Sequence, residues 1–221
     1  MGPARSRRFD WIAGIFIVCV SCSASFADEW PGPQTREVFS KDRNHFVRVA
    51  PGESWGDANG FTGAPKGAYA KAEFYDRRSD GSYALGATVT LLNPVAPVEF
   101  FVTDQGYLLT LDNWHNMGYG KVVALYGADG APIKSYELSD LFSLDEINGF
   151  DHSVSSIWWH KGLAYLQLDS KALYISLDDK GTDLVVDTMF RTYRSCKWQD
   201  PVRVKDFVCR TSNTGRQWLP Y

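Results

Sequence analysis

Three segments of this chain decide its fold: FYDRRSDGSY (residues 74–83), LYGADGAP (125–132) and ISLDDKGTD (175–183). Each segment joins two runs of β-forming residues through an acidic turn that contains a glycine. The glycine can adopt the positive φ that hairpin turns require, and the acidic neighbour can accept hydrogen bonds from the turn amides. The sequence therefore predicts antiparallel hairpins at three points along the chain.

The spacing of the turn glycines indicates a repeated unit. Gly81, Gly130 and Gly181 lie 49 and 51 residues apart. A period near 50 residues is typical of a propeller blade, here a three- or four-stranded meander used three times. Acidic turns with glycine also recur by chance in unrelated β proteins, and the side chains outside the turns match only thinly. Both interpretations stay open at this point.

Short runs of β type, bounded by turn residues, fill most of the remaining chain. They cover residues 46–49, 70–75, 83–92, 98–102, 107–111, 121–126, 133–138, 155–159, 163–168, 172–177 and 183–186. One short helix is predicted, because Ser143 and Glu146 have the spacing of a capping box and Gly149 can end it. We expect an all-β fold of blade-like antiparallel meanders. Three units are fewer than a closed propeller needs, so a small or incomplete β-propeller is expected, with a β-sandwich as the alternative.

The region from about residue 95 to residue 160 resembles a known class of proteins. The segments FVTDQGYLLTLDNW (101–114) and GYGKVVALYGADG (118–130) are similar to a blade of bacterial β-propeller proteins. The Asp-Asn-Trp segment also resembles a set of uncharacterised exported bacterial proteins that carry such a blade. This resemblance implies a propeller-like architecture and export. It implies no activity, because propellers host both enzymes and binding modules.

The first 27 residues have the pattern of an export signal. Arg5, Arg7 and Arg8 precede the apolar run at 11–20, and the segment Ser-Phe-Ala at 25–27 places small residues at the −3 and −1 positions of a cleavage site. The alternative is a lipid anchor, because residues 20–22 resemble a lipobox ending in Cys22. We expect a periplasmic or secreted protein without a transmembrane segment after cleavage, since no apolar run reaches roughly 20 residues.

Charge excludes one class of partner. Cleavage removes three of the 23 basic residues and one of the 26 acidic residues, which moves the net charge from −3 to about −5. A surface of that sign repels phosphate backbones, and no basic cluster with interleaved aromatic residues offsets it. We therefore expect no nucleic-acid partner.

The expected organisation places all of the mature chain in one domain. The predicted parts are a signal peptide at 1–27, an irregular arm at 28–37, a blade-like β domain at 38–190 and a disulfide-tied C-terminal segment at 191–221. Cys196 and Cys209 are the cysteines of the mature chain, and an even pair in an oxidising compartment predicts a disulfide. The alternative, a two-cysteine metal site, lacks further ligands because no histidine follows residue 160.

One polar and aromatic loop is the best candidate for a ligand-binding site. It contains Asp112, Asn113, Trp114, His115 and Asn116, and it connects two apolar strands. Asp112 could exchange a proton with His115, or the oxygens of Asp112, Asn113 and Asn116 could hold calcium. The structural alternative is strong, because Asp and Asn side chains stabilise turns in every β protein.

Tryptophans give a second set of candidates. Exported β domains often stack sugar rings on tryptophan, and Trp55 and Trp114 lie in polar, glycine-rich loops that suit this role. Trp158 and Trp159 are adjacent in a predicted strand, so their side chains must face opposite sides and one of them is expected in the core. A domain of this size can also bury several tryptophans without any ligand.

The usual catalytic signatures are missing from the sequence. It has no helical His-x-x-x-His metal motif, no Gly-x-Ser-x-Gly elbow, no unpaired mature cysteine and no Gly-rich phosphate loop. We expect no catalytic residue, metal or cofactor, and a non-enzymatic binding or structural role in the bacterial cell envelope, with a glycan or an envelope protein as partner. One alternative is a carbohydrate-active or other hydrolytic propeller-like enzyme centred on Asp112 and His115. Another is an interaction module that uses an open sheet edge.

Overall fold

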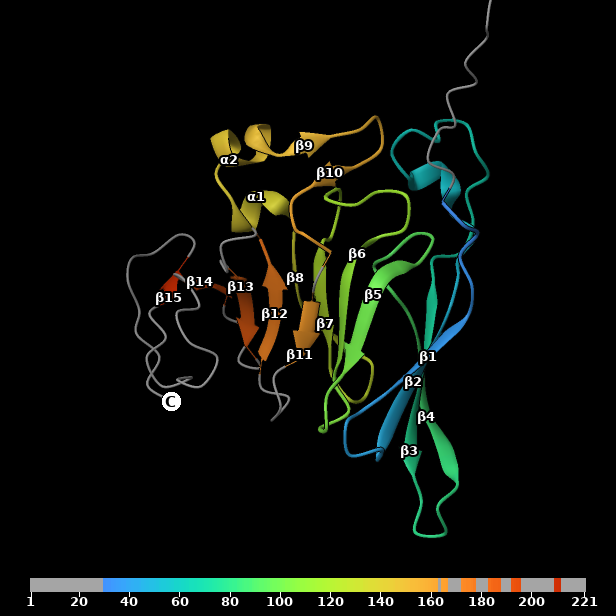
Figure 1. Cartoon of the computed structure of the whole chain (residues 1–221). Helices are drawn as coiled ribbons and strands as arrows, with labels where there is room; N and C mark the ends of the chain where they lie inside the picture. Colours follow the sequence, from blue (N-terminus) through green and yellow to red (C-terminus); the bar gives the residue numbers. More distant parts are fainter. Residues whose placement is uncertain are drawn as a thin grey trace, which may run out of the picture. The chain divides into compact units, whose positions relative to one another are not determined.

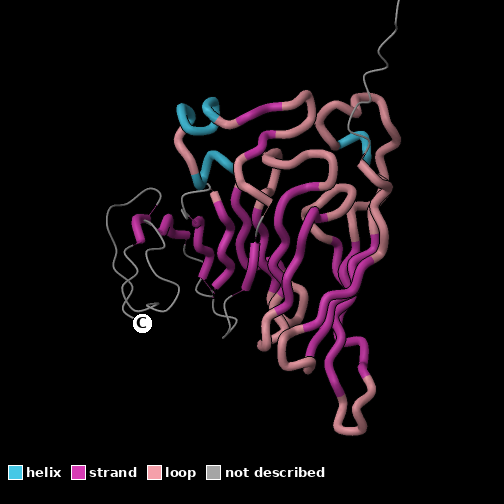
Figure 2. The backbone as a smooth tube through the Cα atoms, viewed as in Figure 1, coloured by secondary structure: helices cyan, strands magenta, loops and turns pink. Residues whose placement is uncertain are grey.

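The structure is a computed structural model of the chain, and it describes residues 30–162, 164–166, 172–177, 183–187, 192–195 and 209–211. Contacts divide the chain into units of Met1–Pro31 and Gly32–Tyr221, and every described element belongs to the second unit. The described elements are mostly antiparallel strands, with short helical turns between some of them (Figure 2). The all-β prediction is therefore confirmed. The predicted export signal lies outside the described residues.

Three larger sheets follow one another along the chain, and each is a meander whose strands pair in sequence order (Figure 1). The first sheet contains β1 (Arg36–Phe39), β2 (His45–Ala50), β3 (Lys71–Arg77) and β4 (Tyr83–Thr90). The second contains β5 (Pro97–Val102), β6 (Leu108–Asn113), β7 (Val123–Tyr126) and β8 (Pro132–Tyr136). The third contains β11 (Ala164–Leu166), β12 (Ala172–Ser176), β13 (Asp183–Asp187), β14 (Thr192–Ser195) and β15 (Cys209–Thr211).

A small two-stranded sheet lies in the chain between the second and third sheets. It pairs β9 (Asp151–His152) with β10 (Ile157–Trp158). Two short helices precede it, α1 (Leu138–Leu141) and α2 (Leu144–Gly149), and a 3₁₀ turn η1 (Trp55–Asp57) lies in the β2–β3 connection. The expectation of a single helix was therefore wrong. The sequence gives α1 no Ser or Thr cap, and the structure caps it instead with Asp140, whose carboxylate accepts from the amide of Glu137 at 2.9 Å.

The predicted helix itself is confirmed as α2. The amide of Ser143 donates to Glu146 Oε2 at 2.9 Å, and Ser143 Oγ accepts from the amide of Glu146 at 3.4 Å. These reciprocal bonds form the capping box expected from the spacing of the two residues. The arm expected at 28–37 is shorter than predicted, because β1 begins at Arg36 and pairs there with Val49.

Two of the three predicted glycine turns are described, and both follow the glycine rule. Gly81 connects β3 to β4 with a φ of 86°, and Gly130 connects β7 to β8 with a φ of 78°. Gly130 is also a point of close approach, because a Cβ added there would lie 2.4 Å from Val89 Cγ1 on the first sheet. Glycine therefore satisfies both the turn and the packing between two sheets. Gly181 lies outside the described residues, and the sequence repeat remains a prediction.

The two central strands of the second sheet, β6 and β7, are buried on both faces. Leu108 on β6 packs into a core shared with the first sheet, whereas Leu109 and Leu111 pack into a core shared with the third. On β7, Ala124 and Tyr126 face the first sheet in the same alternating way. The partners across these cores include Val47, Val49 and Phe74 on one side and Leu173, Ile175, Leu184 and Val186 on the other. This double burial makes the second sheet a firm support for the loop that leaves β6.

Candidate functional site

The end of β6 and the loop that follows it have an unusual backbone. Asp112 and His115 have φ values of 55° and 63°, and Gly118 and Gly120 have φ values of 79° and 65°. Aspartate and histidine tolerate this left-handed region better than most residues with a Cβ. The amide of Asp112 donates to the carbonyl of Val122 at 2.7 Å and closes the loop one residue before β7 begins. The loop is thus a defined turn whose polar side chains are aimed by the backbone.

The carboxylate of Asp112 is completely buried and is surrounded by donors. Oδ1 accepts from the amide of Gly118 at 2.8 Å. The indole Nε1 of Trp159 donates to both oxygens, at 3.0 Å and 3.1 Å. Oδ2 also lies 2.7 Å from His160 Nε2. These donors replace the water that a buried carboxylate would otherwise need.

The second contact of His160 fixes which ring nitrogen carries the proton. His160 Nδ1 accepts from the amide of Gly162 at 2.9 Å, so Nδ1 is an acceptor and Nε2 donates to Asp112. Both ring nitrogens are therefore occupied by groups of the chain, and the side chain is 3% exposed. Asp112 and His160 form a link between the end of β6 and the segment that leads into β11.

The two asparagines of the loop also bind other parts of the backbone. Asn113 Oδ1 accepts from Asn93 Nδ2 at 2.8 Å, and Asn113 Nδ2 donates to the carbonyl of Tyr119 at 2.7 Å. Asn116 Nδ2 donates to the carbonyl of Asn59 at 2.9 Å, and Asn116 Oδ1 accepts from the amide of the same residue. Asn113 therefore holds the loop together, and Asn116 ties it to the β2–β3 connection. The side-chain oxygens of Asn113 and Asn116, which the sequence suggested as calcium ligands, therefore make structural hydrogen bonds instead.

The aromatic candidates gather next to this loop. The His115 ring lies 4.9 Å from the Trp55 ring, 5.4 Å from the Phe61 ring and 6.4 Å from the Trp114 ring, measured between centroids. Burial among these rings lowers the pKa of His115, because a charged imidazole is poorly solvated there. The structure thus brings Trp55, Trp114 and His115 together, as an aromatic cluster.

The structure pairs Asp112 with a different histidine from the one the sequence suggested. The hydrogen bonds of its carboxylate go to Gly118, Trp159 and His160, and the carboxylate is turned into the protein interior. The proton exchange considered for Asp112 and His115 needed an accessible carboxylate within about 3 Å of His115. Asp112 does not meet this requirement, because its carboxylate is buried and bonded to other groups.

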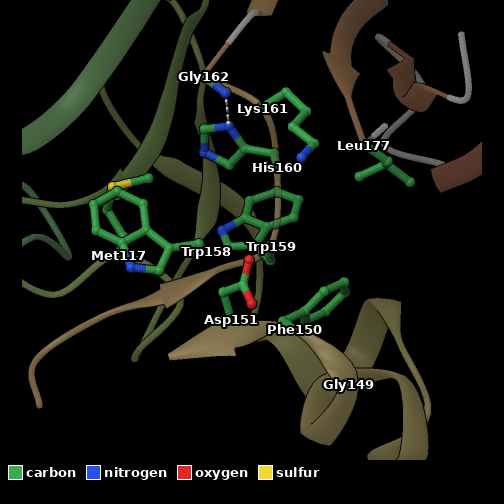
Figure 3. Close-up of a pocket in the computed structure, with 10 residues that line it drawn as sticks. All are labelled: Met117, Gly149, Phe150, Asp151, Trp158, Trp159, His160, Lys161, Gly162 and Leu177. Atoms are coloured by element: carbon green, nitrogen blue, oxygen red, sulfur yellow. Dashed lines mark hydrogen bonds between the residues drawn. The ribbon is translucent and has the colours of Figure 1, made fainter. Parts of the chain in front are cut away.

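A cavity of about 540 Å³ is lined in part by Trp159 and His160. Its lining includes Met117, Phe150, Asp151, Trp158, Lys161 and Leu177 (Figure 3). This volume is in the range of sites for small molecules. The sequence did not point to this region, because its residues come from separate segments: the β6–β7 loop, the end of α2, β9 and β10, and the chain next to β11 and β12.

Two lining residues of this cavity form a cross-strand pair. Trp158 on β10 lies directly opposite Asp151 on β9. Residues opposite each other in an antiparallel pair share one face of the sheet, so the two side chains start from neighbouring Cβ atoms on the same face. Trp158 is 43% exposed, whereas the next residue, Trp159, is 1% exposed. The prediction that one of these two tryptophans lies in the core is confirmed, and the other is available at the cavity.

A smaller cavity of about 240 Å³ lies between the β6–β7 loop and the β2–β3 connection. Asn113, Trp114 and Asn116 line it, together with Asp57 and Tyr69. Both asparagines there already bind the chain, so the polar groups of this cavity are largely engaged. The larger cavity is the better candidate for a ligand site.

Other features bear on cofactors, membranes and cysteines. Within the described ranges, no three His, Cys, Asp or Glu side chains come close enough to hold a metal ion. No helix in the described part of the chain is both long and apolar enough to cross a membrane. Cys209 begins β15, where it is opposite Ser195, but Cys196 lies outside the described residues. The disulfide therefore stays a prediction.

Comparison with protein-family models and with curated proteins finds no match for this chain. The function is therefore argued from the two cavities, the aromatic cluster and the bonds of the loop.

Proposed function

We propose that the mature chain is an exported, non-enzymatic binding protein of the bacterial cell envelope that holds a small ligand in the cavity at Trp158. The observation that carries this proposal is the cross-strand pair of Trp158 and Asp151 at the cavity wall. An indole that is 43% exposed beside a carboxylate combines apolar area with a fixed hydrogen-bond acceptor. Binding pockets generally combine aromatic and apolar side chains with a few placed polar groups.

The bonds of Asp112 and His160 favour binding over catalysis. A general base must be within reach of a substrate proton. The Asp112 carboxylate is buried and bonded to Trp159 and His160, and both nitrogens of His160 have partners in the chain. The hydrolytic alternative centred on Asp112 and His115 thus gains no support from this geometry. The residues instead form a rigid floor beneath the cavity.

A thermal-shift screen with the full chain tests the proposed function. Neutral sugars, amino acids and divalent metal ions are added to the protein, to Trp158→Ala and to Ile133→Ala. Ile133 is an exposed apolar residue on β8 that does not line the cavity, so its variant is the matched control. A ligand at 100 times its Kd adds about 2.7 kcal/mol to the free energy of unfolding. We expect a shift that Trp158→Ala loses and Ile133→Ala keeps, and the absence of any such shift would count against a ligand site here.

Export and the disulfide need separate tests. We expect N-terminal sequencing of the secreted or periplasmic protein to begin at Asp28, because the predicted cleavage site follows Ala27. Thiol counting on the same material should find Cys196 and Cys209 oxidised. A lipid-modified Cys22 would replace the cleaved-signal prediction with the anchored form.

A second candidate function, protein interaction through an open sheet edge, is favoured by β4. This edge strand of the first sheet runs over Tyr83–Thr90 without a charged residue or a proline, and Leu85 on it is 53% exposed. Charged residues and prolines usually protect natural edge strands from pairing with another chain. A β-bulge opposite Phe74 and Tyr75 is the protective feature that β4 does have. We expect self-association in sedimentation velocity that Leu85→Lys abolishes, and a monomer at high concentration would exclude this function.

A further inference from the structure

The wall of the larger cavity joins an aromatic plane to a carboxylate. Trp158 and Asp151 are opposite each other across β9 and β10, so their Cβ atoms are expected about 4.5–5.5 Å apart on one face. Phe150 precedes Asp151 in the chain and also lines the cavity, and Leu177 lies on the opposite side of the space (Figure 3). The lining therefore offers a ligand both aromatic surface and a carboxylate acceptor.

We propose that this cavity binds a neutral pyranose saccharide, which stacks on Trp158 and donates hydroxyl hydrogen bonds to Asp151. This inference rests on the proposed binding function and names the ligand class. One face of a pyranose ring presents C–H groups that pack on the face of an aromatic ring. The hydroxyls radiate from the edge of the sugar ring, where a carboxylate can accept two of them in charge-assisted bonds. The arrangement of Trp158 and Asp151 matches both features at once.

The charges of the lining agree with a neutral ligand. Asp151 contributes one negative charge and Lys161 one positive charge, so the wall does not strongly favour an anion or a cation. A nucleotide or a sugar phosphate is usually held by several cationic or amide donors. A volume of about 540 Å³ is large enough for a sugar unit with part of a second one.

The floor of the cavity is held in place before any ligand arrives. Trp159 and His160 line the cavity, and both donate to the buried carboxylate of Asp112. Asp112 in turn belongs to the buried strand β6. A preformed site loses less conformational entropy on binding than a flexible one. This matters for sugars, because stacking and hydroxyl hydrogen bonds together give only a modest binding free energy. A large loss of conformational entropy would cancel it.

A zwitterionic amino acid is the competing ligand, since Asp151 and Lys161 could hold its ammonium and carboxylate groups. Lys161 already interacts with another group of the chain, which weakens this alternative. The face of Trp158 also offers more area than a small aliphatic side chain would use. The saccharide is therefore the ligand class that these observations favour.

Titration calorimetry with the full chain tests the inference. The probes are glucose, galactose, mannose, N-acetylglucosamine and cellobiose in one arm and L-leucine and L-phenylalanine in the other. The variants are Trp158→Ala, Trp158→Phe, Asp151→Asn and the control Ile133→Ala. We expect at least one sugar to bind, with a Kd raised about tenfold or more by Trp158→Ala. Trp158→Phe should weaken binding less, Asp151→Asn should weaken it several-fold, and Ile133→Ala should leave it unchanged.

Each of the other outcomes overturns the inference in a distinguishable way. A sugar that binds Trp158→Ala as well as the unmodified protein uses a different site. An amino acid that binds, depends on Trp158 and has no sugar competitor would replace the ligand class but retain the proposed function. If neither arm binds at millimolar concentrations, both the saccharide inference and the proposed function fail. Melting temperatures of the variants show whether a lost signal reflects unfolding, and Trp158→Phe preserves the test if the alanine variant does not fold.

Discussion

Asp112 Oδ2 lies 2.7 Å from His160 Nε2, although the two residues are 48 positions apart in the sequence. Their side chains are 0% and 3% exposed, so water does not compete for this contact. The contact joins the end of β6 to the segment that leads into β11, and Trp159 strengthens it with its indole donor. Asp112, which the sequence suggested as a reactive group, is therefore a structural residue. It binds Trp159 and His160, which line the cavity.

We expect Asp112→Asn to lower the free energy of unfolding by about 3 kcal/mol. Asparagine tolerates the positive φ of 55° at this position, so the change tests the carboxylate rather than the backbone. The variant keeps one acceptor oxygen, while three donor groups, from Gly118, Trp159 and His160, compete for it. Urea denaturation measures the loss.

A matched control for this variant is Asp145→Asn, in the first turn of α2. This aspartate is exposed, and its charge lies near the N-terminal end of a short helix. We expect a loss below about 0.5 kcal/mol. Equal losses for the two variants would show that the bonds of Asp112 contribute little to stability.

The adjacent tryptophans provide a direct comparison of a buried and an exposed ring. Trp159→Phe removes the Nε1 donor to Asp112 and leaves space in the core, so we expect a loss of about 2–4 kcal/mol. Trp158→Phe changes an exposed ring at the cavity and should cost less than about 0.5 kcal/mol. Chemical denaturation of both variants, with their fluorescence, checks the order. The reverse order would contradict the assignment of Trp159 to the core.

The two glycines of the loop test how tightly it packs on β10. A Cβ on Gly118 would lie 2.6 Å from Ile157 Cβ and 2.8 Å from its carbonyl oxygen, whereas a Cβ on Gly120 would lie 3.4 Å from its nearest neighbour, Asn113 Nδ2. Both glycines have a positive φ, which costs alanine about 1–2 kcal/mol. In Gly118→Ala, but not in Gly120→Ala, overpacking should lower the free energy of unfolding by about another 1–3 kcal/mol. Thermal unfolding of the two alanine variants measures this difference, and similar losses would argue against the close contact.

Local rules explain what the sequence could predict. The turns at Gly81 and Gly130 follow from the need for a positive φ, and the helix α2 follows from the capping box of Ser143 and Glu146. The opposite burial of Trp158 and Trp159 follows from the alternation of side chains in a strand. Each of these predictions uses residues that are close together in the chain.

Contacts between distant segments explain what the sequence could not predict. The sequence contains two Trp-His pairs, at 114–115 and 159–160, and nothing in either pair shows which histidine reaches Asp112. His115 is nearer to Asp112 in the sequence and is therefore the expected partner. Sheet packing brings His160 to the carboxylate instead. The cavity depends on the pairing of β9 and β10, which contain two residues each and are too short to leave a strand pattern. The site could therefore be found only once the sheets were assembled.

Glu99 on β5 makes the stability of the protein depend on pH. Its pKa is raised, chiefly by burial and further by the charge of Asp112, while the charge of Arg36 opposes the change. The folded state therefore binds the Glu99 proton more tightly than the unfolded state does. This contribution to stability is complete below the pKa of the unfolded chain, about 4.3, and is lost as the pH rises through the higher pKa of the folded state.

Glu99→Gln should remove this loss, because glutamine stays neutral at every pH. We expect the variant and the unmodified protein to have similar stability below about pH 4 and the variant to become relatively more stable as the pH rises. Urea denaturation over a pH series measures the difference, with Glu53→Gln, an exposed glutamate, as the control. Parallel stability curves for the unmodified protein and Glu99→Gln would show that the Glu99 carboxyl is as well solvated in the folded protein as in the unfolded chain.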